Sequence, residues 1–154
     1  VHQKGLLHRA ITVYVFSSDH RLLLQQRASG KYHCGGLWSN TTCGHPYPQE
    51  STQHAAERRL FEEMGLRLTL QPMFELSYRL PLSNGLIEHE YGHVYFAISD
   101  ALPEVNPEEA DGWRYGTLAE IEQEMQSHPE RFTPWFLHTF ARIPAEFARF
   151  IARQ

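Results

Sequence analysis

The chain has 154 residues, which is enough for one domain with its own hydrophobic core. Its formal net charge of −4 argues against a protein that binds nucleic-acid phosphates. It contains no run near the roughly 20 apolar residues that span a bilayer, and no signal peptide opens it. Since two cysteines without export signals suit a reducing compartment, we expect a single cytoplasmic domain over residues 1–154 that binds neither nucleic acid nor membrane.

Alternating apolar residues and β-branched residues predict several strands. A strand over 9–17, a turn at 18–20 and a returning strand over 21–26 predict a hairpin. Further extended segments are expected over 38–42, 67–81, 86–98 and 113–115. The residues at 82–85 predict a turn, and those at 101–110 an acidic loop.

A central helix is predicted from 51 to 64. Its apolar face consists of residues spaced four apart, namely Ala56, Leu60 and Met64. The neighbouring face carries Arg59 and Glu63, and Gly65 is placed to end the helix. Later helices are expected over 118–126, 134–142 and 144–153, with a break at Pro144. Strands around a central helix, followed by more helices, predict an α/β or α+β sandwich.

Glu88 and Glu90 lie on one face of the predicted strand over 86–98, with His89 on the other. Two neighbouring carboxylates indicate either that a cation binds between them or that this part of the strand is a solvated edge of the sheet. Taken alone, this feature favours the solvated edge. Among the ten histidines, the candidates to join them are His2, His8 and His45. Such a mixed set of imidazoles and carboxylates would suit Zn²⁺ or Mn²⁺. Tyr78 is an ordinary tyrosine unless it reaches Glu90. We expect four histidines to be solvated surface residues, namely His20, His54, His128 and His138.

Cys43 has two interpretations. A cysteine is most often a small buried hydrophobe. This one follows the polar run at 39–42 and precedes a Gly-His-Pro turn, which favours partial exposure and a role as acid or base. Cys34 has no comparable surroundings and receives no role, although a disulfide between the two remains an alternative.

Arg27, Lys31 and Arg59 would form a cationic pocket if the loop after the second strand folds over the central helix. Ordinary surface charge explains them equally well. Trp38 and Trp135 are expected in the core, although a tryptophan that faced the pocket would stabilise a cation there.

The central stretch resembles the Nudix box, Gly-x5-Glu-x7-Arg-Glu-apolar-x-Glu-Glu-x-Gly-apolar. Gly44 and Glu50 match its first two positions, and Arg-Arg-Leu-Phe-Glu-Glu-Met-Gly-Leu at 58–66 matches the rest except at Arg59. In Nudix hydrolases the residue at that position is a glutamate that helps bind the catalytic Mg²⁺. The replacement argues against ordinary diphosphate hydrolysis.

The chain resembles one branch of the Nudix fold family nearly end to end. This branch is the type I isopentenyl-diphosphate Δ-isomerases. The matching motifs are Leu-His-Arg-Ala at 7–10, Trp-Ser-Asn-Thr-Thr-Cys-Gly-His-Pro at 38–46, Arg58-Arg59, Tyr78-Arg79, Glu-His-Glu at 88–90 and Thr-Pro-Trp at 133–135. The resemblance implies a sandwich with a mixed β-sheet, the Nudix-box helix and C-terminal helices. It also implies that a strand and a basic residue, which the family has before its first metal histidine, are absent here or were removed.

The resemblance implies two metal sites. A Mn²⁺, Mg²⁺ or Zn²⁺ ion would be bound by His2, His8, His45, Glu88 and Glu90. A second ion, Mg²⁺, would be held against the substrate by Glu63 and the backbone carbonyl of Cys43.

The resemblance also assigns roles in catalysis and substrate binding. Cys43 and Glu90 would form the catalytic pair, and Tyr78 would assist Glu90. Trp135 would lie along the isoprenoid tail. The diphosphate would be gripped by three cations, namely Arg27, Lys31 and Arg59.

The implied activity is the interconversion of isopentenyl diphosphate and dimethylallyl diphosphate for isoprenoid biosynthesis, by a monomer or weak homodimer acting on a small molecule. One rival is a Mg²⁺-dependent Nudix hydrolase of a nucleoside diphosphate derivative, which phosphate release would reveal. Another is a noncatalytic metal- or diphosphate-binding module, which would bind metal without turnover. The sequence leaves open the metal, the oligomeric state, and which of Cys43 and Glu90 is the acid in each direction.

Overall fold

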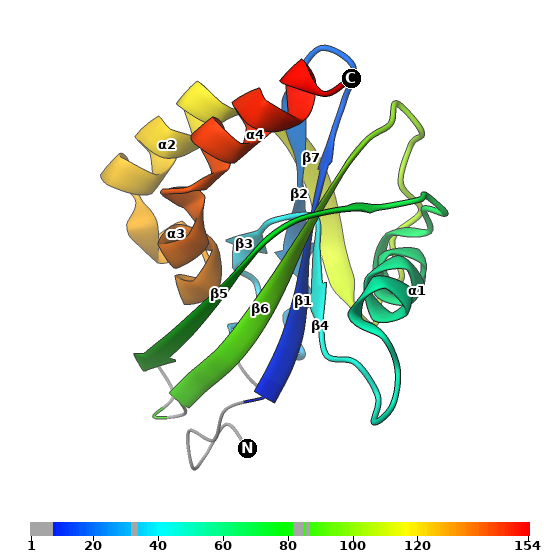
Figure 1. The fold of residues 1–154 in the computed structure, drawn as a ribbon. Helices are drawn as coiled ribbons and strands as arrows, with labels where there is room; N and C mark the ends of the chain where they lie inside the picture. Colours follow the sequence, from blue (N-terminus) through cyan, green and yellow to red (C-terminus); the bar gives the residue numbers. More distant parts are fainter. Residues whose placement is uncertain (1–7, 32–33, 82–84, 86) are drawn as a thin grey trace.

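A computed structural model describes residues 8–31, 34–81, 85 and 87–154, and its main feature is a mixed β-sheet with helices on both faces (Figure 1). The strands are His8–Phe16 (β1), Arg21–Arg27 (β2), Trp38–Ser39 (β3), Thr42–Gly44 (β4), Gln71–Pro81 (β5), Ile87–Ile98 (β6) and Ala110–Thr117 (β7). The helices are Thr52–Met64 (α1), Leu118–Ser127 (α2), Pro134–Phe140 (α3) and Ile143–Ala152 (α4), with a 3-10 turn at Pro129–Arg131 (η1). The predicted sandwich is confirmed.

The sheet is mixed because β1 and β6 run parallel while the other pairs run antiparallel. Its strands follow the order β3-β2-β1-β6-β5, with β4 also paired to β1 and β7 to β2. The parallel register begins with His8 opposite Glu90 and ends with Phe16 opposite Ile98. On the far side of β6, Tyr78 of β5 stands opposite Glu90. This topology brings the start of the described chain beside a strand from its second half.

Each face of the sheet has its own apolar core. On the α1 face, the buried helix residues pack against alternate residues of β1, namely Ile11, Val13 and Val15. The intervening Tyr14 and Phe16 point to the opposite face, where they pack with aromatic residues of α3 and α4. Figure 1 shows α1 on one side of the sheet and α2, α3 and α4 on the other. Because both faces are covered, β1 is apolar along nearly its whole length.

Helix α1 agrees with its prediction at both ends. The hydroxyl of Ser51 accepts a hydrogen bond from the backbone N–H of His54, which caps the first turn. The apolar face predicted for the helix is fully buried. Gly65 ends the helix with a φ of 69°, and a Cβ there would lie 2.7 Å from the backbone oxygen of Glu104. Glycine therefore meets both the conformation and the spacing at this position.

The predicted hairpin is confirmed only near its turn. β1 and β2 pair at Phe16 and Leu22, and the strands then diverge. The side chain of Thr41 lies between them, because its hydroxyl accepts from the N–H of Val15 at 2.9 Å and donates to the carbonyl of Leu23 at 2.6 Å. The long antiparallel partner of β2 is instead β7.

The single strand predicted over 38–42 is wrong, since the chain forms two short strands with different neighbours. β3 pairs with β2, whereas β4 pairs with β1. The chain crosses between them at Asn40, whose side-chain N–H groups donate to the carbonyls of Val13 and Thr42. The brief strand expected over 113–115 is part of the longer β7, which includes the turn-like residues Gly112 and Gly116. Most of the turn predicted at 82–85 lies outside the described residues.

The C-terminal helices are confirmed, and Pro144 stands in the first turn of α4, where a proline is tolerated. Within the described part of the chain, every helix is too short or too polar to cross a bilayer. Cys34 and Cys43 are thiols, so the disulfide considered for them does not form.

Candidate functional site

A pocket of about 220 Å³ lies where β1, β4 and β6 meet α1 and α3. Most of the predicted site residues line it, namely Arg27, Lys31, Cys43, His45, Arg59, Glu63, Tyr78, Glu90 and Trp135. His8 contacts two of these residues. His2 and the side chain of Glu88 lie outside the described structure. The four histidines expected on the surface are exposed.

Three of the predicted metal ligands converge at one point. His8 begins β1, His45 follows β4, and Glu90 lies in β6. Nε2 of His8 lies 2.6 Å from Oε2 of Glu90, and Nε2 of His45 lies 3.0 Å from Oε1. The two imidazole nitrogens are themselves 3.0 Å apart. All three donor atoms therefore lie within 4.8 Å of one another.

This arrangement fits a divalent cation. Two ligands that meet an ion at right angles, each about 2.1 Å from it, are separated by about 3.0 Å. The measured separations are close to this value. Glu90 is only 3% exposed, and its carboxylate faces two imidazole nitrogens. Two imidazoles and a carboxylate form a donor set typical of divalent metals.

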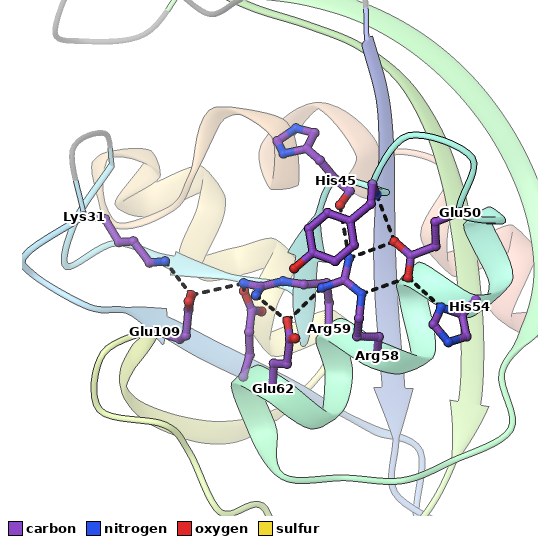
Figure 2. Close-up of polar contacts among 10 residues, drawn as sticks. Lys31, His45, Glu50, His54, Arg58, Arg59, Glu62 and Glu109 are labelled. Carbon is purple, nitrogen blue, oxygen red and sulfur yellow. Dashed lines mark hydrogen bonds and ion pairs between the residues drawn. The ribbon is translucent and has the colours of Figure 1, made fainter.

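The loop that carries His45 is fastened to α1 by an ion pair within the Nudix-box motif (Figure 2). Arg58 binds both carboxylate oxygens of Glu50, at 2.8 and 2.9 Å. The N–H of Tyr47 donates to the same carboxylate, and Arg58 reaches the carbonyl of His45 at 3.4 Å. The hydrogen bond from Arg58 is the main reason that the pKa of Glu50 falls to about 2. The Glu50 and Arg58 positions of the motif thus support the loop.

Cys43 lies in β4 and is one of the residues that line the pocket. The thiol donates to Oδ1 of Asn40 at 3.2 Å, and the amide nitrogen of Asn40 is fixed by two backbone carbonyls. Burial raises the pKa of Cys43 to about 12, and the charge of Glu63 acts in the same direction. A hydrogen bond with Asn40 and the charge of Arg27 only partly oppose these effects. The thiol therefore retains its proton at neutral pH.

Two aromatic side chains complete the walls of the pocket. Tyr78 stands directly opposite Glu90 across the β5–β6 pair, so both side chains lie on the same face. Trp135, near the start of α3, belongs both to the apolar core and to the pocket lining. Tyr78 is 9% and Trp135 4% exposed. Trp38 instead lies beneath Arg114, 4.7 Å from the guanidinium.

All three predicted cations line the pocket. Oε2 of Glu109 accepts from both Lys31, at 2.5 Å, and Arg59, at 3.0 Å. Arg27 lies 5.1 Å from the ring centre of Trp135. Burial alone would lower the pKa of Arg59, but the neighbouring carboxylates raise it above its usual value. Arg59 is therefore fully charged.

Glu63 is a buried carboxylate with both oxygens engaged. Oε1 accepts from Nε2 of Gln25 at 3.0 Å, and Oε2 accepts from Arg59 at 2.5 Å. It lines the pocket with Cys43, as its predicted role beside a second ion requires. That second ion stays a prediction.

Sequence reasoning missed three residues that support the site, namely Gln25, Asn40 and Glu109. Asn40 had a signal, because it lies in the polar run before Cys43. Gln25 and Glu109 had none, since their partners lie far away in the sequence and Glu109 is one of several acids in its loop.

Comparisons with known proteins agree with this fold. A family model described as the NUDIX domain matches residues 6–136. The structure is similar to the MutT protein from Methanosarcina mazei Go1, with a TM-score of 0.75, 16% identity, and coverage of 93% of this chain and 96% of that chain. It is also similar to a MutT NUDIX hydrolase from Burkholderia pseudomallei, with a TM-score of 0.69, 20% identity, and coverage of 90% and 98%. At these identities the likeness shows the fold alone.

Curated relatives are much more similar in sequence. The isopentenyl-diphosphate Delta-isomerase of Pectobacterium atrosepticum is 60% identical over 153 residues, covering 99% of this chain and 86% of the relative. The isopentenyl-diphosphate Delta-isomerase 2 of Aromatoleum aromaticum is 49% identical over 142 residues, covering 92% and 75%. The chain therefore belongs to the Nudix family and, within it, to the isopentenyl-diphosphate Delta-isomerases.

Proposed function

We propose that this enzyme interconverts isopentenyl diphosphate and dimethylallyl diphosphate by proton addition and proton removal in the pocket described above. The observation that carries the mechanism is that Cys43 and Glu90 line one small pocket. The names of the curated relatives support the overall activity.

The reaction moves a carbon–carbon double bond without oxidation or reduction. A proton adds to the terminal alkene carbon of isopentenyl diphosphate, which leaves a tertiary carbocation at the branched carbon. Loss of a proton from the carbon nearer the diphosphate forms the new double bond. Water would react with the cation, so the pocket must exclude it. The nearly buried rings of Tyr78 and Trp135 suit this need, and the face of Trp135 would stabilise the positive charge.

Two groups exchange protons with the substrate in this proposal. Glu90, assisted by Tyr78, acts on one side of the substrate, and Cys43 acts on the other. The raised pKa of Cys43 means that its resting form carries a proton. Asn40 accepts the thiol hydrogen bond and so orients the sulfur.

A divalent ion would be held by His8, His45 and Glu90, together with the predicted ligands His2 and Glu88. Bound there, Mn²⁺, Mg²⁺ or Zn²⁺ would supply positive charge that fixes the Glu90 carboxylate and tunes its acidity. The predicted second site, at Glu63 and the Cys43 carbonyl, would hold Mg²⁺ against the diphosphate.

The diphosphate serves as a handle in this proposal. Arg27, Lys31 and Arg59 would bind it, and Arg59 stands where Nudix hydrolases have a metal-binding glutamate. A guanidinium there suits retention of the diphosphate rather than its cleavage. The predicted substrate class is a small isoprenoid diphosphate. The oligomeric state, a monomer or weak homodimer, stays a prediction. So does the reducing compartment, which suits the thiols of Cys34 and Cys43.

The decisive experiment incubates the purified protein with isopentenyl diphosphate and Mg²⁺ in deuterated water. We expect deuterium-labelled dimethylallyl diphosphate and no phosphate release. Phosphate release without an allylic product would instead identify a hydrolase. Metal or diphosphate binding without either product would identify a noncatalytic binding module.

A further inference from the structure

Glu109 connects two cations of the pocket that come from different parts of the chain. The same oxygen, Oε2, lies 2.5 Å from Nζ of Lys31 and 3.0 Å from Nη2 of Arg59. Figure 2 shows Glu109 between these two side chains. Both cations line the pocket. We propose that Glu109 is a positioning residue that holds Lys31 and Arg59 together for binding the substrate diphosphate. This inference rests on the proposed function, because it takes the diphosphate as the ligand of these cations.

The backbone holds Glu109 in place relative to both partners. Its carbonyl accepts from the N–H of Ala28, close to Lys31, and its own N–H donates to the carbonyl of Asn106. The N–H of Asn106 in turn donates to the carbonyl of Glu63 in α1, the helix that carries Arg59. The segment before β7 is thus fastened both to the loop after β2 and to the end of α1. The carboxylate is fixed with respect to both cations.

Electrostatics explains why two cations at one wall need such a partner. Two like charges held this close repel each other, and a lysine side chain has a long flexible stem whose ordering costs entropy. An oxygen shared by both groups offsets the repulsion and restricts Lys31 to the pocket side. Burial would raise the pKa of Glu109, but the hydrogen bond from Lys31 and the charge of Arg59 outweigh it, so the pKa lies below its usual value. The shared carboxylate is therefore ionised at neutral pH.

The other carboxylates around Arg59 do not have this geometry. Glu62 contacts Arg59 at 2.7 Å, but its second described ion pair is with Arg58, at 2.9 Å. Glu63 is buried and bound to Gln25. Among the described residues, Glu109 alone bridges the cation of the loop after β2 and the cation of α1. Glu62 therefore provides a matched control, since Glu62→Gln removes the same charge from Arg59 without touching Lys31.

The test compares Glu109→Gln with Glu62→Gln in the full chain. Isothermal titration with inorganic pyrophosphate and Mg²⁺ should show about tenfold weaker binding for Glu109→Gln. The reason is that the pyrophosphate loses its charge-assisted contacts with one of the two cations that Glu109 holds. The KM for isopentenyl diphosphate should rise by a similar factor, with kcat changed by less than about threefold. Glu62→Gln should change both quantities by less than about threefold. The side chain of Glu109→Asp is one methylene shorter and keeps the charge. Its pyrophosphate affinity and its KM should lie between those of the wild type and of Glu109→Gln.

A double-mutant cycle tests whether Glu109 acts through Lys31. The double variant Lys31→Ala/Glu109→Gln should bind pyrophosphate less than about threefold more weakly than Lys31→Ala alone. If Glu109→Gln lowers the pyrophosphate affinity of Lys31→Ala by as much as it lowers that of the wild type, the proposal is overturned. Unchanged or tighter pyrophosphate binding by the single variant Glu109→Gln would also overturn it, because Glu109 would then compete with the diphosphate for the cations. A wild-type protein that binds pyrophosphate but forms no dimethylallyl product would refute the proposed function and leave this inference standing.

Discussion

His8 and Glu90 face each other as register partners of the parallel strands β1 and β6, with Nε2 of His8 2.6 Å from Oε2 of Glu90. His45 reaches the same carboxylate from the loop after β4. The three donors come from separate parts of the chain, so an ion at this point would be held by the tertiary fold. Glu90 is the member of the group that both imidazoles contact.

Replacing Glu90 with Gln should therefore remove metal affinity and activity together. The amide keeps the size of the side chain but loses the charge that a cation requires, and we expect isomerisation to fall by at least about 100-fold. Bound metal should be measured by elemental analysis, and the fold by circular dichroism. Glu75→Gln, at an exposed carboxylate of β5 that bonds Tyr91, is the control and should keep both properties. Near wild-type turnover in Glu90→Gln would count against the mechanism.

Cys43→Ala should abolish isomerisation while the fold survives. In the proposed mechanism the thiol exchanges a proton with the substrate, so its loss should lower kcat by at least about 100-fold. The measurement is dimethylallyl diphosphate formation, with the melting temperature as the check on folding. Cys34→Ala is the control, since it removes the other thiol of the chain. Equal activity in the two variants would show that the pocket thiol takes no part in the reaction.

Asn40→Ala should destabilise the protein as well as slow the reaction. Its amide donates to the carbonyls of Val13 and Thr42 and accepts from Cys43, in a fully buried environment. Because each buried group left without a partner costs about 1–3 kcal/mol, the free energy of unfolding should fall by about 2–4 kcal/mol. Urea unfolding provides the measurement. Asn106→Ala makes the same change at an exposed position and should cost no more than about 0.5 kcal/mol. Similar losses in both variants would contradict this account.

The ion pair between Glu50 and Arg58 predicts a dependence of stability on acid. The pKa of Glu50 is about 2 in the folded protein and 4.5 in its ordinary state, so the folded protein favours the charged form. The stabilisation is fully present above about pH 4.5 and is lost as the pH falls through 2. In Glu50→Gln, the melting temperature should be lower at pH 7 and should decline less between pH 4.5 and 2.

The control for this measurement is Glu122→Gln, at an exposed position of α2. It removes one negative charge and should leave the pH profile close to that of the wild type. If the melting temperature of Glu50→Gln also follows the pH dependence of the wild type, the ion pair adds no stability.

The central helix could be predicted almost to the residue because its signals are local. Ser51 caps it, apolar residues spaced four apart form its buried face, and Gly65 ends it. Strand pairing could not be predicted in this way. Nothing near Asn40 shows that β3 joins β2 while β4 joins β1, because that choice depends on partners far away in the sequence.

The site shows the same division. The types of residue and the family motifs pointed to His8, His45 and Glu90, but their convergence depends on the parallel pairing of β1 with β6. Glu109 carried no local signal at all. Its importance appears only when the loop holding Lys31 is placed beside α1.

The register of β1 against β6 also has a consequence for the order of events during biosynthesis. His8 is translated before its partner Glu90, which follows about half the length of this chain later, and contacts between such distant segments close slowly. While the ribosome is still adding the intervening residues, His8 and His45 have no carboxylate from β6 to join. A nascent chain should therefore complete this set of metal donors only after β6 has emerged, which would make uptake of a divalent ion a marker of the pairing of β1 with β6.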